Sequence, residues 1–335
     1  MSAENLLTRV TSDWQAQLRD CISSSLELLG FLGLDPSALD AGEAAASDFP
    51  VKVPHSFARR MRHGDARDPL LLQVLAQGQE LVAVPGYSND PVGESSGVIR
   101  RPGVIHKYHG RALLIVTAGC AVNCRYCFRR HFPYEENRNS RAEWSEALDY
   151  IRSDSTIEEI ILSGGDPLVA TDAHLADLLA QLDDIPHVRR LRVHTRVPVV
   201  LPDRVTPELV RALSGSELQT VVVIHANHAN EIDASVAGAM RTLHEADITL
   251  LNQSVLLRGV NDNIDALTAL SEALFAAHVL PYYLHLLDPV KGAAHFDVPF
   301  PEAKALHRQL AAQLPGYLVP RLVREDAGAE GKTLL

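Results

Sequence analysis

The feature that most limits the fold of this chain is an alternation of short apolar runs with helical patterns from residue 112 onward. Six runs rich in strand-forming residues are separated by stretches with helical periodicity. The runs cover residues 112–117, 159–163, 190–195, 220–225, 249–255 and 281–286, and the helical stretches cover 141–152, 172–182, 206–213, 233–246 and 264–278. Repeated βα units form parallel sheets or barrels with right-handed crossovers. The pattern therefore predicts an α/β fold, a partial (βα)6 barrel.

Polar or potentially ligating residues stand at the end of each predicted strand. They are three cysteines after the first strand, Ser163 to Asp166 after the second, His194 to Arg196 after the third, His225 to His228 after the fourth, Gln253 and Ser254 at the fifth, and His285 and Asp288 after the sixth. The active site of a parallel βα fold gathers at the carboxyl ends of its strands. A single histidine would more often be structural, so the prediction of an active site rests on the strand ends taken together.

The cysteines after the first strand are spaced C-x3-C-x2-C, at Cys120, Cys124 and Cys127. Three thiolates from one loop suit an iron–sulfur cluster, because iron in such clusters is held by soft sulfur ligands. A cluster with four irons and three protein ligands leaves one iron open for a substrate or cofactor. The spacing therefore favours a [4Fe-4S] cluster with an open iron.

Two other interpretations of these cysteines remain at this point. A structural zinc site needs four protein ligands, and His131 nearby could complete a Cys3His set. The fourth cysteine, Cys21, lies far upstream in a predicted amphipathic helix, where a buried small apolar role is expected. A disulfide would leave an odd thiol in a chain without a secretory context.

Composition excludes some functional classes. The chain has 335 residues, 46% of them hydrophobic, and a formal net charge of −11. Such a charge disfavours a general nucleic-acid binder, although Arg125, Arg129 and Arg130 form a local basic group beside the cysteines. The start lacks the apolar segment of a signal peptide, and no apolar run reaches membrane-spanning length. We therefore expect a cytoplasmic protein that contacts neither nucleic acid nor membrane.

The segment before the first strand is predicted to be helical. Trp14, Leu18, Cys21 and Leu29 follow one helical face, and a second helix is predicted to begin at Asp68-Pro69. Residues 85–103 are rich in turn-forming residues and predict a loop. We expect an N-terminal helical extension with a linker over 1–105, a barrel core over 106–290, and a C-terminal segment over 291–335 that closes the active site.

The cysteine motif, with Tyr126 before its last cysteine and Gly164-Gly165-Asp166 on the next unit, resembles that of the radical S-adenosylmethionine enzymes. Longer segments resemble the lysine 2,3-aminomutases over essentially the whole chain. These segments are 120–133, 252–262, 281–285, 293–296 and 331–333. Residues 104–109, 120–133 and 317–321 are most similar to the branch that makes β-lysine for elongation factor P (EF-P).

The resemblance implies three cofactors, which are a [4Fe-4S] cluster on Cys120, Cys124 and Cys127, S-adenosylmethionine at the open iron, and pyridoxal 5′-phosphate. It implies that S-adenosylmethionine is bound by Gly164, Gly165, Asp166 and His225. It also implies that pyridoxal phosphate is bound covalently by Lys332 and contacted by Tyr108, Arg111 and Gln253. Gly331-Lys332-Thr333 also matches the end of a phosphate-binding P-loop, but Asp326 stands where that motif requires its first glycine.

For the substrate, the resemblance implies that Arg129 binds the α-carboxylate and Asp288 binds the ε-ammonium group. A second acidic residue is expected shortly before Lys332, where Asp326 stands one residue closer to Lys332 than the family spacing. A planar guanidinium binds a carboxylate through two parallel hydrogen bonds, which suits Arg129 to this role.

The activity implied is an isomerisation of free L-α-lysine to β-lysine, in the R form, by transfer of the amino group from C2 to C3. A ligase would then attach the product to EF-P, and a flavodoxin or ferredoxin would supply electrons. The alternatives are a catabolic lysine 2,3-aminomutase, a relative acting on glutamate or arginine, and a non-catalytic metal-binding module on the translation apparatus. The oligomeric state, a homo-oligomer included, is left open.

Overall fold

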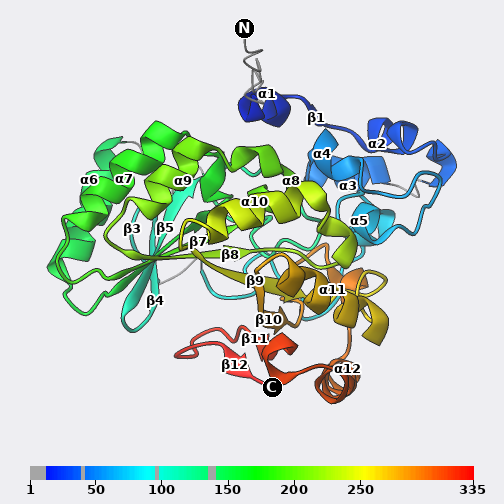
Figure 1. Ribbon diagram of the computed structural model, residues 1–335. Helices are drawn as coiled ribbons and strands as arrows, with labels where there is room; N and C mark the ends of the chain where they lie inside the picture. Colours follow the sequence, from blue (N-terminus) through cyan, green and yellow to red (C-terminus); the bar gives the residue numbers. More distant parts are fainter. Residues whose placement is uncertain (1–12, 39–41, 95–97, 135–140) are drawn as a thin grey trace, which may run out of the picture.

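The computed structural model describes residues 13–38, 42–94, 98–134 and 141–335. In these residues one sheet of ten strands runs in the order β12-β11-β10-β9-β8-β7-β6-β5-β4-β3 (Figure 1). The strands are β3 (Ile99–Arg101), β4 (Val104–Tyr108), β5 (Arg111–Thr117), β6 (Glu159–Gly164), β7 (Arg190–Thr195), β8 (Gln219–Ile224), β9 (Thr249–Val255), β10 (Leu280–His285), β11 (Arg321–Arg324) and β12 (Thr333–Leu334). Neighbours from β5 to β11 pair in parallel, and β3, β4 and β12 pair antiparallel.

The α/β fold predicted from the alternating pattern is confirmed. Strands β5 to β10 correspond to the six predicted strands, with ends that differ by at most one residue. The predicted helical stretches are α6 (Arg141–Ser153), α7 (Asp172–Asp183), α9 (Pro207–Ser214), α10 (Ala234–His244) and α11 (Ile264–Ala276). Among the described residues β3 and β12 form the two ends of the sheet, so the barrel is partial.

The crossover helices begin at polar caps and bury one apolar face. The Thr171 side chain accepts a hydrogen bond from the His174 amide at the start of α7, and Thr206 caps α9 just before Pro207. Helix α7 then buries leucines at helical spacing, which are Leu175, Leu178, Leu179 and Leu182. Each fully buried leucine contributes about 1.5–3 kcal/mol. These contacts fix the helices against the sheet and leave the strand ends available for chemistry.

The N-terminal part differs from the prediction of one long helical face. It contains α1 (Trp14–Arg19), β1 (Cys21–Ile22), α2 (Ser25–Phe31), η1 (Pro36–Ala38), α3 (Gly42–Asp48), β2 (Val53–Pro54), α4 (His55–Ala58), α5 (Pro69–Leu72) and η2 (Gly78–Leu81). The helix breaks at Cys21, because β1 pairs with β2 and Ser24 starts a new helix by capping the Glu27 amide at 3.1 Å. The predicted start at Asp68-Pro69 is confirmed, since the Asp68 side chain accepts from the amides of Leu70 and Leu71.

The C-terminal part adds strands β11 and β12 to the sheet that forms the barrel. It contains η6 (Ala294–Phe296), α12 (Phe300–Gln313), η7 (Gly316–Leu318), β11 and β12. Strand β11 pairs in parallel with β10, and β12 returns beside β11, so that Lys332 lies directly before β12. The sheet thus extends across both predicted boundaries, at residues 105/106 and 290/291. The division into three parts remains a prediction. No helix in the described ranges has the length and apolar character needed to cross a membrane.

The remaining short helices lie in the connections at the carboxyl ends of the strands. They are η3 (Pro167–Val169), α8 (Val197–Val200), η4 (Pro202–Arg204) and η5 (Ala229–Glu231). Three of these connections follow β6, β7 and β8 directly, so they position the polar residues predicted at those strand ends.

Candidate active site

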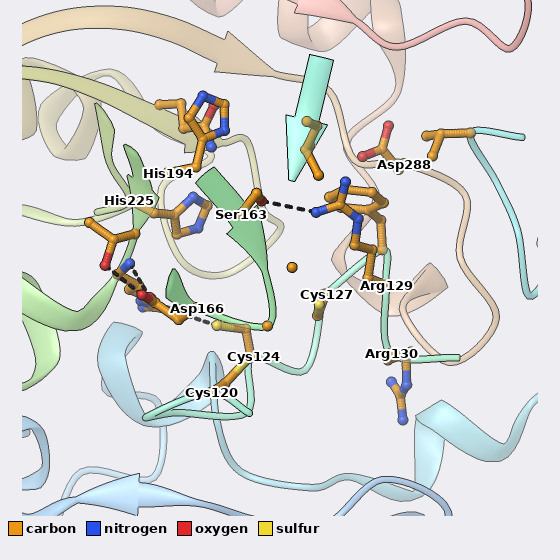
Figure 2. A pocket seen from close by; sticks show the side chains of 18 of the residues that line it. Cys120, Cys124, Cys127, Arg129, Arg130, Ser163, Asp166, His194, His225 and Asp288 are labelled. Atoms are coloured by element: carbon orange, nitrogen blue, oxygen red, sulfur yellow. Dashed lines mark hydrogen bonds between the residues drawn. The ribbon is translucent and has the colours of Figure 1, made fainter. Parts of the chain in front are cut away.

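A cavity of about 630 Å³ lies at the carboxyl ends of the parallel strands. The candidate residues that line it are Tyr108, Arg111, Cys120, Cys124, Cys127, Arg129, Gly164, Gly165, Asp166, His225, Gln253, Asp288 and Lys332. Figure 2 shows the cysteine loop on one side of this space, with His194 and His225 on another and Arg129 and Asp288 facing them. The strand ends therefore meet as predicted, and among the sequence candidates Asp326 is the one that does not line the cavity.

The three cysteines are half-buried on the loop that follows β5. Burial, followed by the nearby Cys124, raises the pKa of Cys127 to about 11, and burial also raises the pKa of Cys120 well above its usual value. Bare thiolates at Cys120 and Cys127 are therefore unfavourable here, whereas the positive charge of bound iron would stabilise them. A set of soft sulfur donors that opens on a cavity fits a [4Fe-4S] cluster with an open iron.

His131 does not lie with the three cysteines at the cavity, as a Cys3His zinc site would require. His131 lies outside the cavity lining, and its Nε2 atom contacts the Lys291 carbonyl oxygen at 3.2 Å. Within the described ranges, no group of three His, Cys, Asp or Glu side chains has the geometry to hold a single metal ion. Cys21 packs behind the loop, where its thiol donates to the Leu18 carbonyl at 3.3 Å.

Gly164 and Gly165 are required by close backbone packing against the cysteine loop. A Cβ atom on Gly164 would lie 2.6 Å from the Thr117 carbonyl oxygen, and one on Gly165 would lie 2.3 Å from the Gly119 carbonyl oxygen. Gly164 also has a φ of +113°, which L side chains rarely adopt. The Gly165 amide donates to the Thr117 carbonyl at 2.8 Å, so the two loops are joined directly.

The Asp166 carboxylate accepts four hydrogen bonds from the connections after β6 and β7. It accepts hydrogen bonds from the Thr195 hydroxyl and the Arg196 amide at 2.7 Å each, from the Leu168 amide at 3.0 Å and from the Val197 amide at 3.2 Å. Burial raises the pKa of Asp166 to about 6 in spite of these donors. Asp166 therefore holds the cavity wall together, and a contact to S-adenosylmethionine stays a prediction.

His225 is a buried neutral ring that contacts the tyrosine of the cysteine motif. The Tyr126 hydroxyl accepts from Arg196 and from the Asn227 side chain, both at 2.7 Å, and lies 2.8 Å from His225 Nε2 and 3.3 Å from Gln73 Oε1. The hydroxyl donates to Gln73 Oε1, and the direction of its contact with His225 Nε2 depends on the tautomer of that ring. Burial, followed by the charge of Arg196, lowers the pKa of His225 to about 3, so the ring is neutral.

Arg129 presents a guanidinium that is already oriented by a buried acid. Its Nε and Nη2 atoms donate to the Glu94 carboxylate at 2.7 and 2.9 Å, and Nη1 donates to the Ser163 hydroxyl at 3.0 Å. A guanidinium has five N–H donors, so these three contacts leave donors for a ligand carboxylate. Glu94 was not predicted, since an acid in a loop rich in turn residues has no distinguishing pattern.

Lys332 pairs with Glu325, a residue that the sequence interpretation missed. Lys332 Nζ donates to Glu325 Oε2 at 2.9 Å, Lys107 Nζ donates to Oε1 at 3.0 Å, and the Tyr108 hydroxyl also donates to Oε1. Burial alone would raise the pKa of Glu325, but the charge of Lys332 and these hydrogen bonds lower it to about 2. Glu325 is therefore the anionic group beside Lys332 in the cavity.

Asp326 points away from this group. Its side chain is 38% exposed, pairs with Arg324 at 2.7 Å and accepts from the Thr333 hydroxyl at 2.6 Å. Successive residues of an extended segment point to opposite sides, so Glu325 and Asp326 cannot both face the cavity. The substrate contact expected for Asp326 is therefore not supported by its position, although the spacing to Lys332, one residue short, was a sign that Asp326 did not match the family position.

Asp288 places a buried carboxyl group in the cavity. Its Oδ1 atom is buried and has no hydrogen-bond partner among the described residues. Burial raises the pKa of Asp288 to about 7, against the effect of the Lys332 charge. A buried carboxyl oxygen without a donor is costly unless a ligand supplies one, so Asp288 is suited to a cationic ligand.

Further unpaired polar atoms belong to residues that line the same cavity as Lys332. The buried Nε atoms of Arg111 and Arg192, and the Nε2 atoms of His194 and His285, have no hydrogen-bond partner within the described part of the chain. All four residues line the cavity, and Arg111 lies 5.0 Å from the centre of the Tyr108 ring. Cationic donors, aromatic rings and a lysine amine fit the phosphate, ring and aldehyde of pyridoxal phosphate. Arg192 was missed, because its inward position depends on the register of β7.

Comparison with known proteins decides the family. Residues 114–270 match the model of the radical SAM superfamily. The chain is 51% identical to L-lysine 2,3-aminomutase from Escherichia coli (strain K12), with 98% of this chain and 96% of that protein covered. This chain belongs to the lysine 2,3-aminomutase family of radical SAM enzymes. It is therefore an enzyme, an isomerase, and not the metal-binding module that the cysteines alone left open.

Two further lysine 2,3-aminomutases show how widely the similarity extends. The protein from Haemophilus influenzae (strain ATCC 51907 / DSM 11121 / KW20 / Rd) is 48% identical over 97% of this chain and 96% of its own length. The protein from Clostridium subterminale is 33% identical over 96% of this chain and 77% of its own length. Membership in this family implies a [4Fe-4S] cluster, S-adenosylmethionine and pyridoxal phosphate as cofactors.

Proposed function

We propose that this enzyme converts L-α-lysine to β-lysine. The observation that carries the proposal is the arrangement of one cavity with a cationic end at Arg129 and buried carboxylates at Asp288 and Glu325, beside Lys332. A lysine substrate has a carboxylate and an ε-ammonium group, which need groups of these charges in a closed site. Glutamate lacks the cation that Asp288 would bind, so Asp288 disfavours glutamate as a substrate.

The cysteines Cys120, Cys124 and Cys127 would hold the cluster, and Gly164, Gly165, Asp166 and His225 line the space beside them for S-adenosylmethionine. Lys332 would bind pyridoxal phosphate, with Tyr108, Arg111, Gln253 and Arg192 around it. When bound, the cluster and S-adenosylmethionine supply one-electron chemistry at a C–H bond, and pyridoxal phosphate supplies a conjugated ring that spreads an unpaired electron.

The residues of the chain position the substrate and protect the site. Arg129 would orient the α-carboxylate, while Asp288 and Glu325 would hold the ε-ammonium group. The amino group then moves from C2 to C3 as a hydrogen moves from C3 to C2, so that no net oxidation occurs. A cavity that excludes water protects the reactive intermediates of this isomerisation from side reactions.

We also propose the finer functional assignments that the resemblance implies. The product would be the R form of β-lysine, and a separate ligase would attach it to EF-P. A flavodoxin or ferredoxin would supply electrons, and a reducing cytoplasm suits a cluster held by cysteine thiolates. The support for the EF-P branch is the similarity of residues 104–109, 120–133 and 317–321 to that branch.

The direct test is an anaerobic assay of the reconstituted enzyme with S-adenosylmethionine, pyridoxal phosphate and dithionite. We expect β-lysine from lysine and little product from arginine, glutamate or ornithine, measured by chiral chromatography. Addition of EF-P and its ligase then tests whether the R product is used. Preferred turnover of another amino acid would contradict the proposed substrate.

Removal of the charge of Asp288 tests the ammonium site. The Asp288→Asn variant keeps the size of the side chain, and its affinity for lysine is expected to fall by about 2–4 kcal/mol, the usual cost of losing one partner of a buried charge pair. Iron content and pyridoxal phosphate attachment should remain. Asp262→Asn is the matched control, because Asp262 pairs with Arg258 outside the cavity. Unchanged lysine saturation in a cluster-loaded Asp288→Asn variant would mean that the ammonium group is held elsewhere.

The raised pKa of Asp288 predicts a pH dependence of lysine binding. Below a pH of about 7 the carboxyl group is protonated, and lysine binds only as that proton is released. Apparent lysine affinity should therefore rise about tenfold per pH unit up to pH 7 and then level off. Asp288→Asn should lose this dependence. Calorimetry in buffers of different ionisation enthalpy measures the released proton, and its absence in the wild-type enzyme would refute the prediction.

Glu325 and Asp326 form a matched pair for mutagenesis. Glu325→Gln should weaken lysine binding at least about tenfold, because a buried charged partner is lost. Asp326→Asn should change it less than about twofold, because exposed ion pairs contribute little. Lysine saturation curves for both variants decide the assignment, and the reverse order of effects would restore the original expectation for Asp326.

A further inference from the structure

Arg196 joins the cysteine loop to the interior of the protein through a contact with sulfur. It follows β7, and its guanidinium Nη1 atom donates to Cys124 Sγ at 2.7 Å. The same atom donates to the Tyr126 hydroxyl at 2.7 Å. Arg196 is only 6% exposed, so this cation meets a cluster ligand away from solvent.

The guanidinium is fixed on its other side by a buried polar network. Its Nη2 atom donates to Gln73 Oε1 at 2.7 Å and to Glu231 Oε2 at 2.9 Å. Glu231 is fully buried, and its Oε1 atom accepts from the Gln73 side chain at 3.1 Å and from the Asn227 amide at 2.8 Å. The Arg196 backbone amide donates to Asp166 at 2.7 Å. With both ends held, the guanidinium cannot turn away from Cys124.

The two rings that cover this guanidinium remove water from it. The guanidinium carbon lies 5.4 Å from the centre of the Phe57 ring and 5.8 Å from that of Tyr126. In such a low-dielectric environment a charged donor interacts more strongly with nearby negative charge than it would in water. The negative charge nearest to Nη1 is that of the Cys124 thiolate once iron is bound.

A reduced cluster carries one more negative charge than an oxidised cluster. A cationic hydrogen bond to a ligand sulfur therefore stabilises the reduced form more than the oxidised form, and hydrogen bonds to the sulfurs are among the factors that set cluster potentials. We propose that Arg196 is a positioning residue that makes the cluster easier to reduce through its N–H contact with Cys124. The electron comes from an external flavin or iron–sulfur donor, and Arg196 neither gains nor loses a proton.

This proposal rests on Cys124 as a cluster ligand and is independent of the lysine reaction. The test is a potentiometric titration of the reconstituted cluster, followed by electron paramagnetic resonance, without lysine or pyridoxal phosphate. The test variant is Arg196→Gln combined with Glu231→Gln, so that no buried acid is left without its partner. At the wild-type midpoint we expect the ratio of reduced to oxidised cluster to fall about tenfold, which is a midpoint about 59 mV lower for one electron.

Arg125→Gln provides the matched control. Arg125 is also fully buried and pairs with an acid, Glu80, at 2.6 and 2.8 Å, but its guanidinium donates to the Phe49 carbonyl and not to a sulfur. Arg130 remains to pair with Glu80 at 2.9 Å in this control. We expect a change of less than about twofold in the same ratio, because the control removes a buried cation but no N–H contact with sulfur. Equal shifts in both variants would overturn the proposal, since they would indicate a general effect of buried charge.

Two further measurements test the proposal if the double variant does not bind iron. Arg196→Lys keeps the charge and should shift the midpoint in the same direction by a smaller amount. The wild-type enzyme can be produced with arginine that carries ¹⁵N in its guanidinium group. Pulsed electron paramagnetic resonance of its reduced cluster should then show a ¹⁵N coupling that the Arg196→Lys variant lacks. Absence of that coupling in the wild type, or an unchanged midpoint in an iron-loaded variant, would refute the role of Arg196. Neither result would affect the proposed lysine reaction, which the product assay tests.

Discussion

Replacement of Cys120, Cys124 or Cys127 by alanine is expected to abolish both the iron–sulfur cluster and all turnover. Each of these cysteines lines the cavity from the loop after β5, and the described residues bring no other cysteine to its lining. A cluster with three protein ligands has no spare sulfur to replace a lost one. Iron and sulfide analysis with visible absorption should therefore show little cluster in any of the three variants, while circular dichroism stays unchanged.

Cys21→Ala is the matched control for this prediction. Cys21 is also half-buried and close to the loop, since its Sγ atom lies 4.0 Å from the Ala121 carbonyl oxygen. It does not line the cavity, and its thiol donates to backbone carbonyls of α1. The variant should retain its iron and its activity. Loss of iron from Cys21→Ala would mean that a fourth protein ligand exists, and the open iron would have to be abandoned.

Lys332→Ala is expected to lose covalent attachment of pyridoxal phosphate and to reduce β-lysine formation below detection. The cluster should remain, because the cysteines and Lys332 belong to separate parts of the chain that meet only in the cavity. Glu325 keeps its contacts with Lys107 and Tyr108, so a large loss of stability is not expected. Borohydride reduction followed by peptide mapping locates the pyridoxyl group in the wild-type enzyme.

Lys107 makes this experiment specific, since it contacts the same Glu325 carboxylate at 3.0 Å and also lines the cavity. The Lys107→Ala variant should retain the pyridoxyl group on Lys332. Its affinity for ligands in the cavity can change, because Lys107 lines the cavity. A pyridoxyl group on Lys107, or on any lysine other than Lys332, would show that the motif-based assignment of Lys332 is incorrect.

The sequence by itself determined the fold and the meeting of the strand ends. The alternation of apolar runs with helical periods places β5 to β10 within one residue, because strand and helix periods are local properties of the chain. Parallel pairing then forces the carboxyl ends together, which is why Cys120, His225 and Asp288 were expected in one site. The cysteine spacing is equally local, so the sequence favoured an iron–sulfur cluster on that loop, although it left a zinc site open.

Only the tertiary structure decided which polar residues face one another. The choice of Glu325 over Asp326 depends on which side of an extended segment is buried, and a shift of one residue reverses it. The break at Cys21 depends on pairing between β1 and β2, which are distant in sequence. Glu94 and Arg196 have no motif, and their roles follow from contacts with Arg129 and Cys124 that exist only once the loops are packed. Local periodicity thus determines the strands and helices of the α/β fold, whereas charge pairing across the cavity depends on long-range packing.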